Sequence, residues 1–339
     1  MSLMKRKWMF DRSALQKGDI LFTRSEFTGT GIAKATKGNF GHVMLYLDDM
    51  VIHADLKGVY SKNTQRILMN KKERLAAFRL KESLSSQHIE RIESFARSRV
   101  GSIYSIKEAV QSLKNRTNEI VHRYELNTQF CSRLVAQSFA DAGINLVDDF
   151  DFCTPNEIAK SHLLTEVGNA VIQAGVEDIE FSKTEDYNLQ LQKETYKWLE
   201  KVRELAEKRH LKPVKSQTDV GQMVLDYPKL DGEICSFIRE TKYLDFYDVD
   251  ERKNPWRYNS LLMFKLIGSN PSFRKILADE RALNYSILKR VSEERRKAIH
   301  NAQSGLQYFL LEEDLQTMRL AQMNKWKDAI DYVSHIMDA

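Results

Sequence analysis

The spacing of apolar residues changes near residue 164, and this change constrains the fold more than any other feature of the sequence. Between residues 18 and 80, short apolar runs are broken by turn residues, which is typical of strands. Beyond residue 164 the chain is rich in charged and helix-favouring residues and has few turn signals. A chain of 339 residues also exceeds the usual size of one compact core. We therefore expect two domains, residues 1–164 and a mostly helical domain over residues 165–339.

Helices are expected to follow the strands within the first domain. One begins at Ser86, where apolar residues recur at helical spacing, and ends before Gly101. Two more are expected over residues 105–113 and 131–142, the second stopped by Gly143. The first domain is therefore predicted to be α+β, with a small antiparallel sheet packed on helices.

Composition excludes several classes of function. The 52 basic residues nearly balance the 47 acidic ones, for a net charge of +5, so no binding to nucleic acid is expected. No run approaches the roughly 18 apolar residues of a membrane span, and no signal peptide is visible, so we expect no span and a cytoplasmic protein. The three cysteines are too widely spaced for a disulfide framework or a metal clip, which favours reduced thiols.

Residues 42–55 have the composition of a β-hairpin around Asp48-Asp49. If these two aspartates alone form the turn, His42 lies opposite Asp55, and alternation places His53 on the same face. A histidine beside a second histidine and a carboxylate has the neighbours that fix the tautomer and orientation of a catalytic base. A three-residue turn would shift the pairing by one residue, and His42 would then no longer lie opposite Asp55. The alternative interpretation of His42 is a half-buried strand histidine bonded to a backbone carbonyl.

Cys131 lies at the predicted start of a helix whose apolar face includes Leu134, Val135 and Phe139, with Asn127-Thr128 before it as candidate caps. A thiol beside the first amides of a helix, with an imidazole nearby, is expected to have a lowered pKa. The same amides can receive the oxyanion of an acyl-transfer intermediate. The alternative interpretation is that Cys131 fills the core as a small apolar residue.

Several motifs, in their order along the chain, resemble the circularly permuted NlpC-type members of the papain-like superfamily. In these relatives the histidine precedes the cysteine, and the resemblance covers roughly residues 15–167. It leaves the helical half unexplained. The motifs are Gly18-Asp19-Ile20-Leu21, Gly41-His42-Val43, Val51-Ile52-His53-Ala54, Gly58-Val59, Tyr104-Ser105, Tyr124, Phe130-Cys131-Ser132-Arg133-Leu134-Val135 and Thr154-Pro155-Asn156-Glu157-Ile158.

The resemblance implies Cys131 as the nucleophile, His42 as the general base and His53 as the polar residue that orients the base. Many relatives of this type carry a glutamate at the position of His53, whereas the lecithin:retinol acyltransferase-like branch carries a histidine. That histidine hints at lipid acyl chemistry. Asp55 is the alternative orienting residue, because the hairpin register places it opposite His42.

The mechanism that the resemblance implies is attack of the Cys131 thiolate on a carbonyl, with His42 protonating the leaving group. It requires no metal or cofactor. The first hypothesis is an amidase or peptidase acting on small peptide-like substrates, and the second is a lipid acyl hydrolase or acyltransferase. The third is a catalytically inactive binding or scaffolding protein. The helical half would serve as a lid, a partner-binding arm or an oligomerisation element.

Other signals have simpler interpretations. Gly29-Thr30-Gly31 lacks the GKS or GKT ending of a phosphate-binding loop. Cys153 and Cys235 have no histidine at a useful spacing and are predicted to be structural. In the second half, Asn254-Pro255 and Asn270-Pro271 are predicted to mark helix boundaries.

Overall fold

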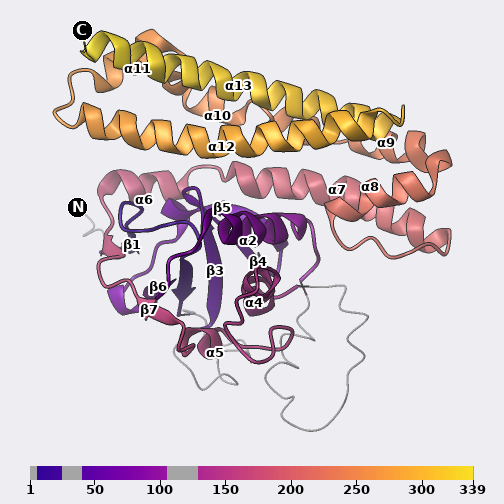
Figure 1. Cartoon of the computed structure of the whole chain (residues 1–339), viewed down its shortest axis with the longest axis horizontal. Helices are drawn as coiled ribbons and strands as arrows, with labels where there is room; N and C mark the ends of the chain where they lie inside the picture. The colour runs from indigo at the N-terminus through magenta and orange to yellow at the C-terminus, as the bar shows by residue number, and fades with distance from the viewer. Residues whose placement is uncertain (1–5, 25–39, 105–128, 339) are drawn as a thin grey trace. The chain divides into compact units, whose positions relative to one another are not determined.

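The computed structural model describes residues 6–24, 40–104 and 129–338 (Figure 1). The chain divides into two compact units, the first of Met1–Gln192 with Pro213–Asp219 and the second of Lys193–Lys212 with Val220–Ala339. Unit 1 combines strands and helices, and unit 2 is helical. The predicted α+β class, followed by a mostly helical region, is therefore confirmed. The helix predicted over residues 105–113 lies outside the described residues.

Unit 1 is built on a six-stranded sheet in the order β5-β4-β3-β2-β6-β7, in which every neighbouring pair is antiparallel. A second, two-stranded sheet pairs β1 with β8. The strands are β1 (Trp8–Phe10), β2 (Ile20–Thr23), β3 (His42–Leu47), β4 (Met50–Asp55), β5 (Gly58–Asn63), β6 (Leu75–Leu80), β7 (Leu164–Glu166) and β8 (Val171–Gln173).

Strands β3 and β4 form a hairpin closed by a two-residue turn, Asp48-Asp49. Both aspartates have positive φ, 49° and 63°, as in a type I′ turn, whose backbone twist matches that of the strands. The Asp48 carboxylate is 2.9 Å from the Lys17 ammonium, and this ion pair helps to hold the turn. The predicted register is confirmed next to the turn, where Leu47 pairs with Met50, Tyr46 with Val51 and Leu45 with Ile52. The ladder ends there, so the expected pairing of His42 with Asp55 is not formed.

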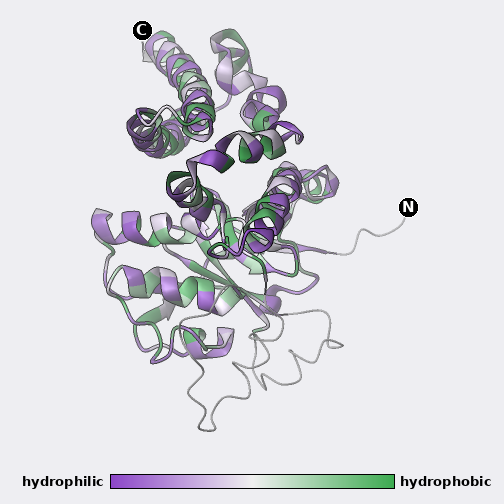
Figure 2. Ribbon diagram, turned by 90° about the vertical axis from the view of Figure 1, so that its right-hand side faces the viewer, coloured by the Kyte–Doolittle hydropathy of each residue, from purple (hydrophilic) through white to green (hydrophobic). Residues whose placement is uncertain are grey.

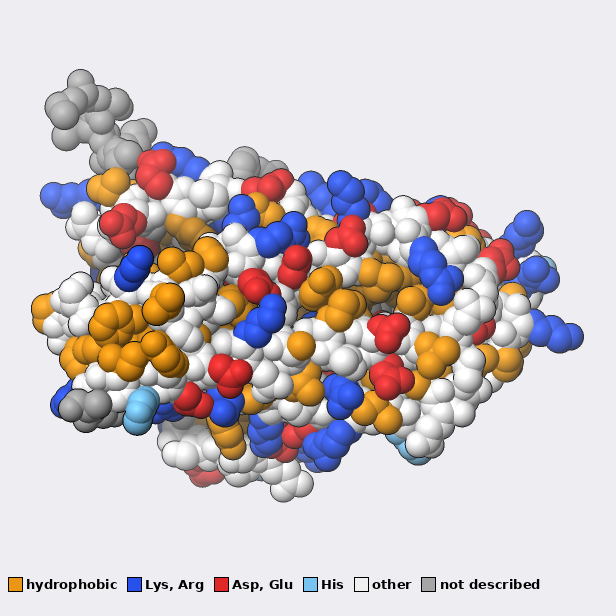
Figure 3. All heavy atoms as spheres, turned by 90° about the horizontal axis from the view of Figure 1, so that it is seen from above, with side chains coloured by type: hydrophobic (Ala, Val, Ile, Leu, Met, Phe, Trp, Pro, Cys, Tyr) orange, Lys and Arg blue, Asp and Glu red, His pale blue; other side chains and the backbone are white. Residues whose placement is uncertain are grey.

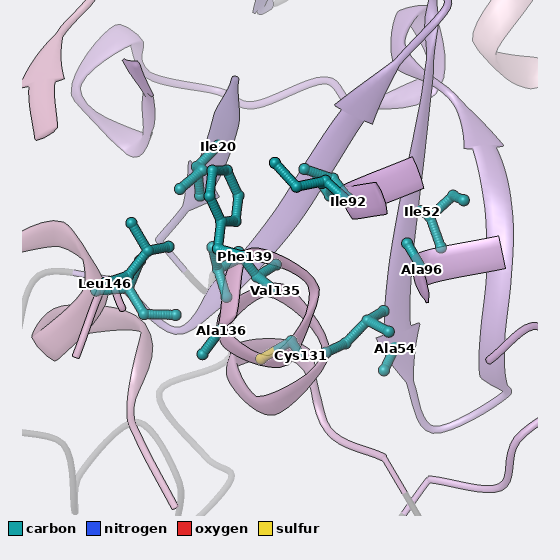
Figure 4. Close-up of a cluster of buried hydrophobic side chains, with 14 of the residues drawn as sticks. Ile20, Ile52, Ala54, Ile92, Ala96, Cys131, Val135, Ala136, Phe139 and Leu146 are labelled. Carbon is teal, nitrogen blue, oxygen red and sulfur yellow. The ribbon is translucent and has the colours of Figure 1, made fainter. Parts of the chain in front are cut away.

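Alternating side chains give the sheet two apolar faces. One face packs on helices α2 (Ser86–Ser98) and α4 (Cys131–Asp141), and both helices begin at the predicted residues. The opposite face carries Met44, Tyr46 and Val51 and packs against Phe10 of β1. The core between the sheet and the two helices includes Ile20, Ile52, Ile92, Ala96, Val135 and Phe139 (Figure 4).

The ends of α2 and α4 follow from local chemistry. The Ser85 hydroxyl accepts a hydrogen bond from the His88 N–H and caps the start of α2. Helix α4 ends at Asp141 with Ala142 as its C-cap, and Gly143 follows with a φ of 85° that favours glycine. The predicted stop at Gly143 is therefore confirmed.

Helices make up the rest of the chain. The core of unit 2 forms where Met263 and Ile267 pack on Trp326 and Ile330. Both Asn-Pro pairs mark helix boundaries, as predicted: Pro255 begins a 3-10 helix, Pro255–Tyr258, and Asn270-Pro271 separates two α-helices. Helix α13 (Gln307–Asp338), which ends at the C label of Figure 2, mixes green and purple residues along its length. The helices are α5 (Pro155–Ala159), α6 (Val176–Lys183), α7 (Tyr187–Lys208), α8 (Gln217–Asp226), α9 (Asp231–Arg239), α10 (Val249–Lys253), α11 (Ser260–Ile267), α12 (Phe273–Ala302) and α13 (Gln307–Asp338).

Within the described part of the chain, no helix combines the length and the apolar character that a membrane crossing needs.

Gly18 shapes the turn that leads into β2. Its φ is +88°, and its N–H donates to the Tyr46 carbonyl oxygen at 3.1 Å. We predict that Gly18→Ala lowers the free energy of unfolding by about 1–2 kcal/mol, because an L side chain at positive φ is strained by roughly that amount. The new Cβ would also lie 2.5 Å from Leu84 Cδ1.

Gly168→Ala is the matched control, since Gly168 has no such φ and its added Cβ would meet no described atom within 4 Å. Its expected effect is within about 0.5 kcal/mol. Urea unfolding followed by circular dichroism measures both variants. Equal destabilisation by the two substitutions would contradict the role assigned to the Gly18 turn.

Candidate active site

Two imidazoles from neighbouring strands meet at one end of the hairpin. His42 begins β3, and its Nε2 lies 3.0 Å from Nδ1 of His53 in β4. The ring of His53 also packs on the Tyr60 ring of β5, with centroids 4.5 Å apart. A single proton occupies the contact between the two histidines, so the tautomer of one ring fixes that of the other. When the shared proton is on Nε2 of His42, Nδ1 of that ring is the nitrogen with the lone pair; when it is on Nδ1 of His53, Nδ1 of His42 carries the hydrogen.

Asp55, the alternative partner of His42, uses its carboxylate elsewhere. It accepts a hydrogen bond from the Lys57 backbone N–H at 2.8 Å and another from the Tyr60 hydroxyl at 2.9 Å. Its negative charge still raises the pKa of His42. The structure therefore places His53 against the His42 ring and leaves Asp55 as a nearby charge.

Burial is the largest influence on the pKa of both imidazoles. It lowers the pKa of His42 to about 4, with Asp55 opposing this effect and Lys62 adding to it. Burial also lowers the pKa of His53 well below its usual value, and neighbouring positive charges act in the same direction. Both rings are therefore neutral near pH 7, which is the form in which an imidazole accepts a proton.

The thiol of Cys131 lies where β3 and β4 stop pairing. Beyond Leu45 and Ile52 the two strands are no longer matched residue by residue, although β3 stays paired with β2 as far as His42. The N–H of Tyr46 faces β2, so alternation directs the N–H of Val43 toward β4. There the Val43 N–H hydrogen-bonds the Cys131 sulfur. The structure thus brings the thiol to the residue that follows His42.

Burial raises the pKa of the Cys131 thiol to about 11, and the hydrogen bonds from the amides of Val43, Ser132 and Cys131 itself only partly offset it. The side chain is 7% exposed. The expectation of a lowered pKa is therefore wrong for this structure, because loss of solvent outweighs the amides at the start of the helix. Asn127-Thr128 lie outside the described residues, and the N-cap is Phe130, whose side chain makes no capping hydrogen bond.

Buried polar contacts fix the first turn of α4. The Ser132 hydroxyl donates to the Cys153 carbonyl oxygen at 2.6 Å. Arg133 is fully buried, donates from Nε to the Asp151 carbonyl oxygen at 2.8 Å and stacks its guanidinium over the ring of Phe130. The chain before α5 is therefore tied to the start of the helix that begins with Cys131.

The start of β3 is held by the amide side chain of Asn156, a residue that the sequence singles out only as a member of the motif over residues 154–158. Asn156 of α5 accepts a hydrogen bond from the Phe40 N–H and donates one to the Phe40 carbonyl oxygen, both at 2.9 Å. Phe40 precedes His42 by two residues, so this pair of bonds fixes the chain as it enters the strand. The sequence carries one related signal, the capping box between Thr154 and Glu157, which marks the start of α5 and hence the helix on which Asn156 lies.

Tyr104 is a further side chain near the thiol. Burial raises its pKa, and the charges of Cys131 and Asp55 raise it further, so its hydroxyl stays protonated near neutral pH. Its backbone forms an isolated bridge with Gln129, two residues before the helix. The motifs of the resemblance include Tyr104 but give it no role, because neither spacing nor composition links it to Cys131.

The other two cysteines lie in the cores. Cys153 is 2% exposed, and burial raises the pKa of its thiol. Cys235 of α9 lies 3.6 Å from the Asp231 carboxylate in unit 2, and burial raises its pKa as well. Among the described residues, no group of three or more His, Cys, Asp or Glu side chains is arranged to hold a metal ion.

In this fold, the strand that begins with His42 comes before the helix that begins with Cys131, and both belong to a unit built on an antiparallel sheet. Residues 14–157 match the model of the family described as "Permuted papain-like amidase enzyme, YaeF/YiiX, C92 family". The match covers less than half of the chain and supports a circularly permuted papain-like family and a cysteine-type hydrolase. No curated protein matches the chain. The finer likeness to NlpC-type enzymes stays a prediction.

The pH dependence of alkylation tests the ionisation of the thiol. We predict that the rate at which iodoacetamide modifies Cys131 rises with pH toward a midpoint near 11, because burial keeps the sulfur protonated at lower pH. Mass spectrometry of the peptide that contains Cys131 measures the rate separately from Cys153 and Cys235. A midpoint at or below about 8.5, the ordinary thiol value, would contradict the effect assigned to burial.

Proposed function

We propose that this chain is a cysteine amidase, with Cys131 as nucleophile, His42 as general base and His53 as the residue that holds the base in place. The observation that carries the proposal is the 3.0 Å contact between the imidazoles, beside the Val43 amide that bonds the Cys131 sulfur. The match of residues 14–157 to a permuted papain-like amidase family supports the same class of chemistry.

The resting pair in this proposal is a neutral thiol and a neutral imidazole. In this proposal the Nε2–H of His42 donates to Nδ1 of His53, so that Nδ1 of His42 keeps the lone pair that takes the thiol proton. As the sulfur attacks the carbonyl carbon, Nδ1 takes the thiol proton and the carbonyl π electrons move to oxygen. Proton transfer thus accompanies bond formation, because neither group is charged beforehand at neutral pH.

Donors for the resulting oxyanion stand close to the sulfur. The backbone amides of Cys131 and Ser132 both hydrogen-bond the sulfur, and no side chain caps the start of α4. Tyr104 adds a protonated hydroxyl, and its pKa responds to the charge of Cys131. Collapse of the intermediate breaks the C–N bond, His42 gives its proton to the departing amine, and the acyl group stays on Cys131 as a thioester. Water then releases the acyl group, with His42 again acting as base.

Small peptide-like amides are the proposed substrates, since the matching family is named for amidases. A lipid acyl ester or thioester is the second candidate. It is favoured by a histidine, rather than a carboxylate, in contact with the base, the feature that the lecithin:retinol acyltransferase-like branch shares. Both candidates use the same acyl-enzyme. A panel of short peptide amides, acyl esters and acyl thioesters separates them, and an absence of turnover on all of them would favour a scaffold that has lost catalysis.

Substitutions at His53 and Asp55 test the orienting role. We predict that His53→Ala lowers kcat about 100-fold or more, because removing the group that fixes a catalytic imidazole costs at least that much. Asp55→Asn, its matched control on the same strand, should change kcat less than about tenfold, because Asp55 acts on His42 through charge alone.

Cys131→Ala should abolish turnover on the substrate that gives the largest rate. Steady-state kinetics of the three variants, each checked for folding by circular dichroism, gives the comparison. Turnover that persists in Cys131→Ala, or a larger loss in Asp55→Asn than in His53→Ala, would contradict the proposed roles.

A further inference from the structure

One segment of unit 2 differs in charge from the rest of the chain. Residues 252–278 hold six basic side chains and no acidic one, although acidic residues are frequent elsewhere. Two of the six are neutralised locally: Arg257 forms hydrogen bonds with both oxygens of Glu280, and Arg252 lies 2.9 Å from Asp248. Lys265, Arg274 and Lys275 are exposed. The segment therefore presents positive charge to solvent over α11 and the start of α12.

Helix α11 lies inside this segment and is apolar on its outer side as well as on its inner side. Met263 and Ile267 point inward and are buried with Trp326 of α13. The outward positions carry large apolar side chains with high exposure, Leu261 at 63%, Leu262 at 42%, Phe264 at 38% and Leu266 at 55%. In Figure 3, orange side chains gather at the left of the view, where α11 and the last turns of α13 lie in Figure 1.

An outer helix face of this kind needs a partner that is both apolar and negatively charged. Scattered exposed leucines are ordinary, but four large apolar residues on one short helix form a contiguous patch. The exposed Lys265 lies among them, and Arg274 and Lys275 follow at the start of the next helix. Apolar residues that enter a headgroup layer, surrounded by lysine and arginine, are the pattern of helices that lie on anionic membranes.

Other occupants fit the same surface less well. A second copy of the chain meeting this face symmetrically would bring Lys265, Arg274 and Lys275 against themselves, and like charges oppose such a contact. A nucleic acid would use the positive charges but would leave four apolar side chains in water. The combination of charge and apolar exposure favours a lipid surface.

We propose that α11, with the basic start of α12, binds the surface of an anionic lipid bilayer. The helix lies along the interface, its outer apolar side chains enter the boundary between headgroups and acyl chains, and Lys265, Arg274 and Lys275 contact the anionic headgroups. This role goes beyond the proposed amidase activity and does not depend on Cys131.

Vesicle co-sedimentation of the full chain tests the proposal. Vesicles of phosphatidylcholine alone are compared with vesicles that also contain phosphatidylglycerol. The expected result is binding to the anionic vesicles that weakens as salt is raised. Leu261→Ser/Leu266→Ser should lower the partition coefficient about tenfold or more, because two large apolar side chains no longer enter the interface. Lys265→Gln/Lys275→Gln should lower it about tenfold on anionic vesicles, because each lysine loses its attraction to the surface.

Leu225→Ser/Leu310→Ser is the matched control, because it removes two leucines that are 47% and 43% exposed elsewhere in unit 2. It should bind like the unaltered chain. The proposal would be overturned if the unaltered chain failed to bind anionic vesicles, or if the control lost as much binding as the α11 variant. Light scattering that shows a dimer, made monomeric by Leu261→Ser/Leu266→Ser, would instead assign the patch to a second copy. If Leu261→Ser/Leu266→Ser misfolds, Lys265→Gln/Lys275→Gln decides: weaker binding to anionic vesicles supports the proposal, and unchanged binding overturns it.

Discussion

The point at which β3 and β4 stop pairing is the constraint on which the rest of the candidate site depends. Continued pairing would use the Val43 N–H within the sheet, whereas the end of the ladder after Leu45 leaves it for the Cys131 sulfur. The same strand begins with His42, whose Nε2 contacts His53 across the gap. A single local feature of the sheet therefore brings together a helix start and two histidines from distant parts of the sequence.

The chemistry of the site follows from its burial away from solvent. Burial raises the pKa of the Cys131 thiol to about 11 and lowers that of His42 to about 4. A thiolate and imidazolium ion pair, the arrangement expected from a helix start, is disfavoured because both charges would be desolvated. The proposed catalysis relies instead on proton transfer during attack, with the amides of Cys131 and Ser132 ready for the charge that develops on oxygen.

Sequence reasoning predicted the hairpin register and the starts of α2 and α4, because each depends on local rules. The two-residue turn Asp48-Asp49 sets which residues of β3 and β4 face each other. Ser85 marks where α2 begins, and Gly143 marks where α4 ends. Strands β1, β7 and β8 were missed because three residues are too few to show alternation. The pKa of Cys131 was predicted in the wrong direction because its burial depends on the core formed between the sheet and the helices, which no local pattern encodes. The bonds between Asn156 and Phe40 were missed for the same reason.

In the proposed site, Nδ1 of His42 serves the Cys131 thiol while Nε2–H is held by His53. Nitrogen NMR of the histidine-labelled full chain tests this arrangement. We expect His42 to be present as the Nε2–H tautomer near pH 7. We also expect Cys131→Ala to shift the Nδ1 resonance of His42 while leaving the contact with His53 intact. A His42 ring protonated on Nδ1, with a resonance that does not respond to loss of the sulfur, would contradict the proposed roles.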